Sequence, residues 1–487
     1  MTTTYRMPEA TARIVRRDLK ASLRHWAALL IVLVGTFMVT LDFFIVNVAI
    51  PSLQQELHAN SGEVQLVVAG YGLALAAGLI TSGRLGDLYG RRRMFVLGLA
   101  LFTLTSAACG LAPTPLSLVI VRVLQGVAAA ILSPQVLAIV GAVYTGADRT
   151  RAFTVYGLAL GIAAVGGQLI GGVLIQADVA GLGWRSCFLI NVPVGIAALV
   201  LAPRLLPEAL AKGSRTLDLI GAGLVTLALV AVVMPLILGR ELGWPLWSWL
   251  SLAASLPLAL AFVSYQRWLL TRNRAPLLDL SLFGERSFTV GLAATLVFFA
   301  GMASFFLVLA LYLQEGRGLT ALVAGITFSA LGFGYLVASL FAGRLTRRLG
   351  RKMLSIGALV MALGLALMLL TVAEIGSSGS IAWLVPALLL DGAGMGLVLA
   401  PLSSLVLAGL PPQHAGAAAG VLATMQQVAN ALGVAIIGII FYGSLGNGSH
   451  LSAYSHAFAA SLVYLVALEV GVAVLIRFVP HDTHGQL

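Results

Sequence analysis

Charged residues are scarce in this sequence of 487 residues: 10% of the side chains are Asp, Glu, Lys or Arg, whereas 60% are hydrophobic. A mean hydropathy of +1.01 excludes a water-soluble globular fold. Acidic residues are the scarcer sign, with 18 Asp and Glu against 29 Lys and Arg. Lipid is therefore the main solvent of this chain, and an acidic side chain within an apolar run is expensive to keep there.

Cysteine is also rare, with two residues in the chain, and the common catalytic motifs are absent from the sequence. Cys109 and Cys187 have neither metal-ligand spacing nor a disulfide-framework pattern, so we expect them to be packing residues. The sequence contains no HExxH, GxSxG or GxxxxGK[ST] motif and no cysteine–histidine cluster. We therefore expect no enzyme, no metal and no cofactor. Without a site for ATP, the energy for transport must come from an ion gradient or from the substrate's own gradient. Protons fit best as the coupling ion, because a proton needs no coordination cage.

Long apolar runs fill most of the chain. Because a bilayer core about 30 Å thick needs about 20 apolar residues in a helix, the sequence predicts fourteen transmembrane helices at residues 26–48, 63–81, 94–111, 115–143, 153–176, 187–206, 217–238, 247–269, 288–313, 321–342, 353–372, 381–410, 415–442 and 455–479.

The net charge of +11 follows the predicted topology. With a cytoplasmic N-terminus, every Lys and Arg falls on a cytoplasmic segment except Arg122, Arg185, Arg240 and Arg317. We therefore expect a multi-pass membrane protein with both termini in the cytoplasm, and no nucleic-acid partner. The basic arm at residues 1–25 is not a signal sequence, because the apolar run behind it is too long.

An internal repeat divides the chain. GRLGDLYGRRR at residues 83–93 returns as GRLTRRLGRK at residues 343–352, an offset of 260 residues. RVLQGVAAAILSP, from Arg122, resembles LLLDGAGMGLVLAP, from Leu388, and this alignment sets Gln125 opposite Asp391. A repeated half is how alternating-access carriers are usually built.

These motifs identify a family resemblance that covers nearly the whole chain. GRLGDLYGRRR resembles the loop motif of the major facilitator superfamily, and VRVLQGVAAA resembles its fourth-helix motif. LDFFIVNVAIP at residues 41–51 and LDLIGAGL at residues 217–224 are similar to motifs of its fourteen-helix branch, the second family of drug and proton antiporters. The antiporter motif of helix five is matched less well, because Gln168 stands where that motif has proline.

The resemblance implies an all-α membrane fold with two pseudo-symmetric six-helix bundles and an inserted helix pair. We expect an arm at 1–25, the first bundle at 26–206, a linker with two extra helices at 207–287, the second bundle at 288–479 and a cytoplasmic tail at 480–487. We further expect a monomer whose partners are a small-molecule substrate, protons and membrane lipids.

Three acidic residues inside predicted spans are candidates for proton coupling. Asp42 should face a cavity or a partner, where it can carry a proton or attract a cationic substrate, or it can be a structural aspartate. Asp391 lies near the expected midplane, and a locked structural hydrogen bond is its alternative role. Glu469 lies about two turns from a helix end, where water could simply reach it.

Arg122 and Gln125 share one helical face because they are three residues apart. An arginine stays protonated, so Arg122 cannot shuttle protons but can tune a nearby carboxylate, a role that the resemblance implies; a structural pair is the alternative. The candidates for substrate binding are Asp42, Phe43, Gln125, Gln168, Phe298, Phe299 and Asp391, and Phe44, Phe305 and Phe306 are further aromatic candidates. Such phenylalanines more often face lipid or core.

Glycines provide two further groups. Small residues allow helices to approach closely, so we expect a seam for rocking motion on the fifth span, formed by Gly157, Gly161, Gly167, Gly171 and Gly172. The resemblance implies that the first loop motif latches the two halves on the cytoplasmic side, through Gly83, Asp87, Gly90, Arg91 and Arg92.

Together with the resemblance, the sequence thus predicts a proton-coupled exporter in the inner membrane of a bacterium. It would carry amphipathic, cationic drugs or antibiotics outward, with the proton and the substrate competing for one central cavity. A lipid or lipid-conjugate translocase on the same scaffold is the main alternative. A membrane sensor without transport is a weaker one, because the sequence has no signalling domain.

Overall fold

The structure is a computed structural model that describes residues 9–144, 146–206, 208, 218–272, 274, 276–278, 280–375, 379–407, 415–446 and 451–479. All regular secondary structure in these residues is helical, and fourteen helical segments are long and apolar enough to cross a membrane. The predicted all-α membrane fold with fourteen spans is therefore confirmed.

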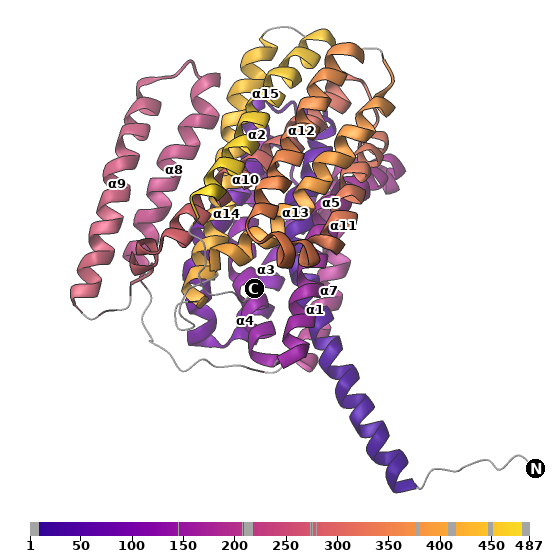
Figure 1. Cartoon of the computed structure of the whole chain (residues 1–487), viewed down its shortest axis with the longest axis vertical. Coiled ribbons are helices and arrows are strands. Elements are labelled where there is room, and N and C mark those ends of the chain that lie inside the picture. The colour runs from indigo at the N-terminus through magenta and orange to yellow at the C-terminus, as the bar shows by residue number, and fades with distance from the viewer. Residues whose placement is uncertain are drawn as a thin grey trace, which may run out of the picture.

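Six of these segments form the N-terminal helix group, coloured indigo to magenta in Figure 1. The first five are α1 (Glu9–Leu57), α2 (Ser61–Tyr89), α3 (Arg91–Gly110), α4 (Pro115–Val143) and α5 (Gly146–Ala177). The sixth is interrupted, with η2 (Gly183–Arg185) and α6 (Ser186–Leu189) leading into α7 (Asn191–Leu205). The helix α1 begins well before the predicted residue 26 and runs out of the bundle as a single projecting rod (Figure 1).

The C-terminal helix group contains six more segments. They are α10 (Arg286–Leu311) with a π-helical turn at its end (Tyr312–Gly316), α11 (Ala321–Leu349), α12 (Lys352–Ile375), α13 (Val385–Leu407) after a 3₁₀ turn (Ile381–Leu384), α14 (Ala415–Leu445) and α15 (Leu451–Arg477). Residues 408–410 of the predicted span 381–410 and the predicted tail at 480–487 lie outside the described residues.

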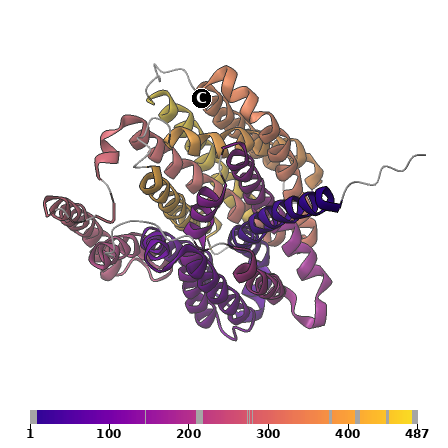
Figure 2. The ribbon, with the colours of Figure 1, turned by 90° about the horizontal axis from the view of Figure 1, so that it is seen from below.

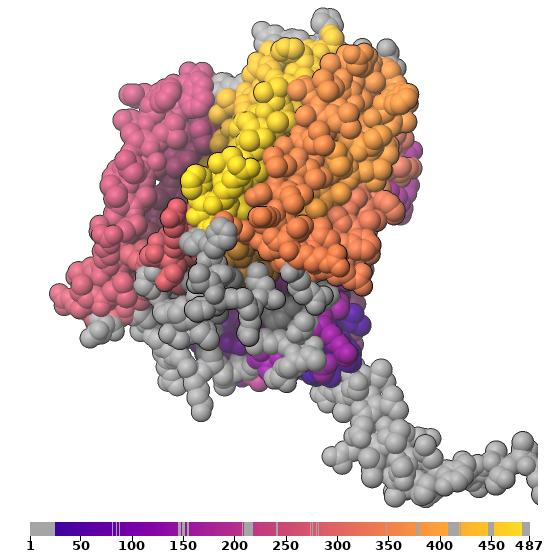
Figure 3. Space-filling view, in the orientation of Figure 1, coloured from indigo at the N-terminus to yellow at the C-terminus, as the bar shows by residue number. Residues whose placement is uncertain are grey.

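The remaining pair, α8 (Leu219–Glu241) and α9 (Leu246–Thr271), stands beside the main body (Figures 1 and 3). The helix α8 packs against α9 and also against α2 and α14, one helix from each group. In the most apolar stretch of α9 only 11% of the residues are buried. This pair is therefore attached through α8 and offers most of α9 to lipid.

The two helix groups lie side by side and repeat the same packing (Figure 2). α2 packs closely on α4, and α11 packs closely on α13. Gly126 makes the first contact possible and Gly392 the second, because a Cβ on Gly126 would lie 2.8 Å from the Ala74 Cβ and one on Gly392 would lie 2.7 Å from the Leu331 carbonyl carbon. The alignment of these two glycines in the sequence repeat therefore corresponds to equivalent places in the fold.

The repeated glycine–arginine motif is mostly helical. The expected loop shrinks to Gly90 in the first copy, because α2 continues to Tyr89 and α3 begins at Arg91. Gly90 and its repeat partner Gly350 have φ angles of +99° and +53°, which residues with a side chain rarely adopt. The turn that the motif predicts is thus present in both copies, but it is one or two residues long.

Contacts between the two groups run along two helix pairs, α5 with α11 and α2 with α14, and α1 also contacts α10. α5 and α11 approach so closely that a Cβ on Gly325 would lie 2.6 Å from the carbonyl oxygen of Gln168. These contacts leave the interior of each group to its own side chains, and both candidate sites are found there.

Candidate functional site

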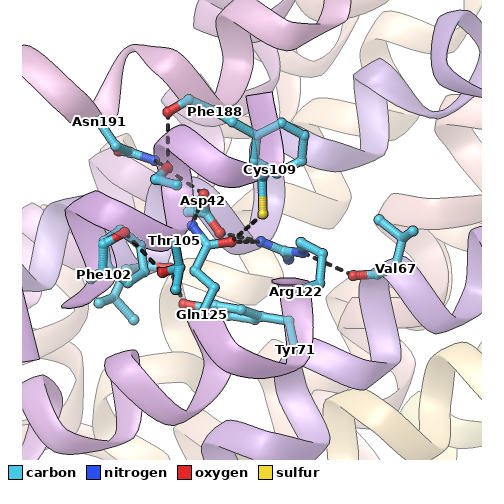
Figure 4. A network of polar contacts seen from close by, with 12 residues as sticks. Asp42, Val67, Tyr71, Phe102, Thr105, Cys109, Arg122, Gln125, Phe188 and Asn191 are labelled. Carbon is cyan, nitrogen blue, oxygen red and sulfur yellow. Dashed lines mark hydrogen bonds and ion pairs between the residues drawn. The ribbon is translucent and has the colours of Figure 1, made fainter. Parts of the chain in front are cut away.

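The first site is a set of polar side chains buried inside the N-terminal group, here called the N-terminal polar site: Asp42 on α1, Ser106 on α3, Arg122 and Gln125 on α4, and Asn191 on α7 (Figure 4). Asp42 lies at its centre and is fully buried. Its Oδ1 accepts hydrogen bonds from Gln125 Nε2 at 2.9 Å and from Asn191 Nδ2 at 3.0 Å, and its Oδ2 pairs with Arg122 Nη1. Three helices, α1, α4 and α7, therefore meet at one carboxylate.

Arg122 balances the charge of Asp42 and is itself held by other groups. Its Nε donates to the carbonyl oxygen of Val67 at 2.9 Å, and its Nη1 also donates to Gln125 Oε1 at 2.8 Å. The guanidinium carbon lies 4.2 Å from the ring centroid of Tyr71, a cation–π distance. Breaking such a buried pair by removing one partner costs about 3–5 kcal/mol, because the other charge is left alone.

A second layer of contacts holds the partners of Asp42 in place. Asn191 Nδ2 also donates to Ser106 Oγ at 3.0 Å, and Ser106 Oγ donates to the carbonyl oxygen of Phe188 at 2.9 Å. The Cys109 thiol donates to Gln125 Oε1 at 3.3 Å, and both cysteines are free and buried, as expected of packing residues. In the N-terminal polar site the charges of Asp42 and Arg122 are thus paired, and Arg122 Nη2 is the guanidinium nitrogen that has no hydrogen-bond partner among the described residues.

The second site is a pocket inside the C-terminal group, here called the C-terminal acidic pocket. Four helices, α10, α12, α13 and α15, supply its walls, which are Gly301, Met302, Phe305, Phe306, Met361, Leu365, Asp391, Met395, Leu465 and Glu469. Asp391 and Glu469 are 2% and 1% exposed. The interior has room for about one water-sized group.

The two carboxyl groups of this pocket lack the partners that Asp42 has. Asp391 Oδ1 and Glu469 Oε2 are buried and accept no hydrogen bond from the described residues. No Lys, Arg or His in the described part of the chain forms an ion pair with either group. An isolated buried carboxylate is costly, so this pocket calls for a proton or a cation.

The predicted aromatic residues divide between the two groups. Phe43 on α1 packs edge-on against Phe44 at 5.0 Å between ring centroids. Phe298 and Phe299 on α10 are buried and pack edge-on at 5.3 Å, but they do not line the C-terminal acidic pocket. Phe306 does line it, and its ring also meets that of Phe44 at 4.9 Å. A wall of the pocket therefore touches the N-terminal group.

The chain matches the Major Facilitator Superfamily over residues 32–434, with a second match over residues 291–485.

The chain belongs to the Major Facilitator Superfamily.

Its curated relatives agree with the predicted branch. The chain is 39% identical over 426 residues to a probable actinorhodin transporter of Streptomyces coelicolor, which covers 87% of this chain and 74% of that protein. It is 36% identical over 468 residues to the puromycin resistance protein pur8 of Streptomyces alboniger, covering 93% and 90%. It is 33% identical over 414 residues to the multidrug resistance protein Stp of Mycobacterium tuberculosis, covering 83% and 74%. The resemblance to fourteen-helix drug exporters is confirmed, and the chain is a multi-pass membrane transporter and not an enzyme.

Solved structures of other transporters share the fold. A partially occluded inward open conformation of the xylose transporter XylE from E. coli superposes with a TM-score of 0.64 at 15% identity, covering 95% of this chain and 99% of that one. A POT family transporter in complex with 5-aminolevulinic acid gives a TM-score of 0.67 at 15% identity, covering 92% and 95%. At this identity the likeness concerns the fold alone.

The predicted glycine seam on α5 has two faces in this superfamily fold. Gly161 and Gly172 face α11 of the other group, where a Cβ would lie 2.7 Å from Tyr335 Cζ and 3.0 Å from the Ala321 carbonyl carbon, respectively. Gly167 and Gly171 face α1 within their own group, against residues 41–48. Gly157 meets no neighbour within 4 Å, so the close-packed seam begins at Gly161.

The remaining helix-five candidate, Gln168, is buried, and its Nε2 donates to the carbonyl oxygen of Phe44 at 2.9 Å. Its Oε1 has no partner among the described residues. Gln168 thus ties α5 to α1 beside the contact with Gly325.

The latch residues of the first motif contact the N-terminal group. Arg91 Nη1 donates to the carbonyl oxygen of Ala138 on α4 at 3.0 Å, and Arg92 Nε lies 3.3 Å from Glu208 Oε2. Gly83 lies on α2, and the side chain of Asp87 lies outside the described residues. A latch between the two halves therefore stays a prediction.

Sequence reasoning missed two features of these sites. It did not find Ser106 and Asn191, which belong to the N-terminal polar site, because a serine and an asparagine in apolar spans are common packing residues. It also did not join Asp391 to Glu469, although both lie in apolar runs of the second half. The signal available was that Asp391 and Glu469 were the two acidic candidates in that half.

Proposed function

We propose that this chain exports amphipathic, cationic drugs or antibiotics across the inner membrane of a bacterium in exchange for protons, with both termini in the cytoplasm. The named functions of its relatives, which include drug resistance and antibiotic transport, support export of small molecules. The positive charges of the sequence support the orientation.

The observation that carries proton coupling is the unpaired state of Asp391 and Glu469. Two carboxyl groups in one buried pocket cannot both ionise without a large penalty, because no cation among the described residues balances either of them. A proton removes that penalty and needs no cage of ligands. These residues are therefore the proposed carriers of the transported proton.

Asp42 has a different part in this proposal. Its carboxylate already has a permanent cation and two amide donors, so a proton has to displace Arg122 before it can bind. We assign to Asp42 and Arg122 the tuning of the N-terminal group and of its response to substrate, and to Gln125 the link between them.

The fold offers a route from the pocket to alternating access. Phe306 lines the pocket and packs against Phe44 on α1, so a change in the pocket can act on the interface between the two groups. The glycines of α5 and α11 bring these two helices into close contact, and we propose that the helices shift against each other there. Substrate and proton can then favour opposite conformations.

The test is transport of ethidium into inside-out proteoliposomes under a proton gradient. The wild-type chain accumulates the dye, and collapse of the gradient abolishes accumulation. Asp391→Asn and Glu469→Gln each reduce gradient-driven accumulation to the level of protein-free liposomes. Glu374→Gln, at an exposed carboxyl group near the end of α12, behaves as the wild type and is the matched control.

Two outcomes contradict the proposal. Dye transport that continues unchanged after the gradient is collapsed removes proton coupling. Movement of a headgroup-labelled lipid between leaflets, without dye transport and without dependence on pH, favours the lipid translocase instead.

A further inference from the structure

The helices α8 and α9 belong to neither polar site, and an exposed basic patch lies at the end of α9 that leads toward α10. This patch, here called the α9 basic patch, consists of Arg267, Trp268, Arg272 and Arg274. Its three arginines are exposed, and Trp268 is 45% exposed. In the described part of the chain, no acidic side chain forms an ion pair with any of these arginines. The patch therefore offers three positive charges to its surroundings.

Hydrogen bonds on the buried side of α9 hold the base of this patch in place. Gln266 is fully buried, and its Oε1 accepts from the backbone N–H groups of Leu277 at 2.7 Å and Leu278 at 3.1 Å. Its Nε2 donates to Asp218 Oδ2 at 2.7 Å, and Asp218 Oδ1 accepts from the N–H of Gly221 at 2.7 Å. Both oxygens of Asp218 therefore already have donors, and the segment that leaves α9 is tied back to the helix.

We propose that the α9 basic patch binds the phosphate headgroup of an anionic phospholipid, whose acyl chains lie along the exposed side of α9. Binding of this lipid does not depend on the driving force of transport. With the orientation proposed above, the lipid belongs to the cytoplasmic leaflet.

The two arginines of α9 flank a tryptophan on the outer side of the helix. Phe262, Gln266 and Leu269 are buried and mark the inner side. Because an α-helix has 3.6 residues per turn, Arg267 and Trp268 fall on the opposite side. Arg272 follows Trp268 by about one turn, so Trp268 lies between the two guanidinium groups around the helix.

Stacked rings give the patch a preformed surface. The rings of Tyr265 and Trp268 are stacked, with 5.9 Å between their centroids and 25° between their planes. The guanidinium carbon of Arg272 lies 5.3 Å from the ring centroid of Trp268, a cation–π distance. A guanidinium group held over a ring presents a planar set of N–H donors and loses less freedom when it binds two phosphate oxygens.

The position of the patch selects a lipid headgroup as its partner. In the most apolar stretch of α9 only 11% of the residues are buried, and the end that carries the patch stands at the lower left edge of the molecule, away from both helix groups (Figure 1). Tryptophan is typical of the level of the headgroups. Arginines at this level attract anionic lipids, and lipid is the solvent beside the rest of α9. The charge of a phosphodiester therefore complements the charge of the patch.

Lipid binding to the purified full-length protein gives a direct test. The protein is delipidated in detergent and titrated with phosphatidylglycerol, and native mass spectrometry counts the bound lipids. We expect the first phosphatidylglycerol to bind several-fold more tightly than phosphatidylcholine, whose trimethylammonium group opposes the arginines. The double variant Arg267→Gln/Arg272→Gln is expected to weaken this first binding step on the order of tenfold, because two charges near the membrane surface are lost.

Matched variants separate the patch from basic charge in general. Arg477→Gln removes an exposed arginine at the end of α15 and is expected to bind phosphatidylglycerol as the wild type does. Trp268→Leu keeps every arginine and is expected to weaken binding by a smaller factor, because Arg272 loses its ring. Without lipid, all variants are expected to unfold at the temperature of the wild type. Phosphatidylglycerol is expected to raise that temperature less in the double variant than in the wild type.

Three outcomes overturn the proposal: unchanged phosphatidylglycerol binding in the double variant, an equally large loss in Arg477→Gln, or equal binding of the two lipids. Displacement of the bound lipid by inorganic phosphate also overturns it, because the patch would then hold a free anion. The proposed function fails separately. If ethidium transport ignores the proton gradient while the double variant still loses its first phosphatidylglycerol, proton coupling is wrong and the lipid site stands.

Discussion

The N-terminal polar site and the C-terminal acidic pocket lie in repeated halves of one fold, yet they treat buried charge in opposite ways. In the first, Asp42 has a permanent cation, two amide donors and a second layer of contacts. In the second, Asp391 and Glu469 share a methionine-lined space with no cation among the described residues. Burial alone therefore does not show that a carboxyl group binds and releases a proton. A buried carboxylate that already has a cation and hydrogen-bond donors gains little from a proton, whereas one without these partners gains much.

The sequence repeat makes this contrast sharper. Gln125 and Asp391 occupy corresponding positions, one residue before the glycines that pack α4 on α2 and α13 on α11. Three residues earlier on the same face, the first half has Arg122 and the second has Leu388. One arginine in one half therefore separates a paired site from an unpaired one.

The largest effect is expected from removing that arginine. Arg122→Leu leaves Asp42 buried without its cation and should lower the free energy of unfolding by about 3–5 kcal/mol. Thermal unfolding of the detergent-solubilised protein measures the loss. The double variant Asp42→Asn/Arg122→Leu should recover part of it, because no unpaired charge remains. Equal stability of the single and double variants would show that the pair does not hold the N-terminal group together.

Replacing a buried aspartate with asparagine is expected to change stability by a smaller amount, and in different directions in the two halves. Asp42→Asn loses charge-assisted hydrogen bonds and leaves Arg122 unpaired, which should destabilise the protein by about 1.5–3 kcal/mol. Asp391→Asn removes an uncompensated carboxyl group and should leave stability unchanged or raise it. Side-by-side thermal unfolding at neutral pH decides this, and equal losses in both variants contradict the comparison.

The contrast between the two sites can also be removed by giving the second half an arginine at the position that corresponds to Arg122. Leu388→Arg places a cation one helical turn before Asp391 on the same face. It should lower stability by about 1–3 kcal/mol through overpacking, and it should end gradient-driven ethidium transport because the pocket no longer needs a proton. Leu388→Met is the control of similar volume. Retained proton-driven transport in a folded Leu388→Arg protein would argue against the role of the unpaired carboxyl groups.

The smallest effect concerns two buried serines. Ser106 Oγ joins Asn191 to the carbonyl oxygen of Phe188, whereas Ser461 on α15 donates to the Ala457 carbonyl of its own helix at 2.8 Å. Ser106→Ala should cost about 1 kcal/mol because two groups lose a partner. Ser461→Ala should be nearly neutral. Chemical or thermal unfolding of both variants resolves the difference, and the reverse order would mean that the second layer around Asp42 contributes little.

The fold was largely predictable because lipid imposes a simple rule on the sequence. Each span needs about 20 apolar residues, and the fourteen predicted spans correspond to the fourteen observed ones. The helix ends were less predictable: α1 and α2 extend well beyond their predicted spans, and Gly90 alone separates α2 from α3. Helices continue past the apolar core wherever no residue stops them, and a hydropathy pattern does not record this.

The sequence predicted the individual candidate residues, but it did not predict which of them lie together in one site. Asp42, Arg122, Asp391 and Glu469 stand out because charge is rare in apolar runs. The expected single central cavity stays a prediction, and the structure places Asp42 and Asp391 inside different helix groups. Partners such as Asn191, which lies 149 residues from Asp42 in the chain, are joined only by packing.

The amino-acid sequence by itself determined the solvent, the number of spans, the internal repeat and the superfamily, because each of these depends on composition or on residues close together in the chain. Only the tertiary structure decided that Asp42 is paired with Arg122 and that Asp391 and Glu469 have no cation beside them in the described part of the chain. The physical reason is that the energy of a buried charge depends on the atoms within a few ångströms of it, and in a helix bundle those atoms come from distant segments.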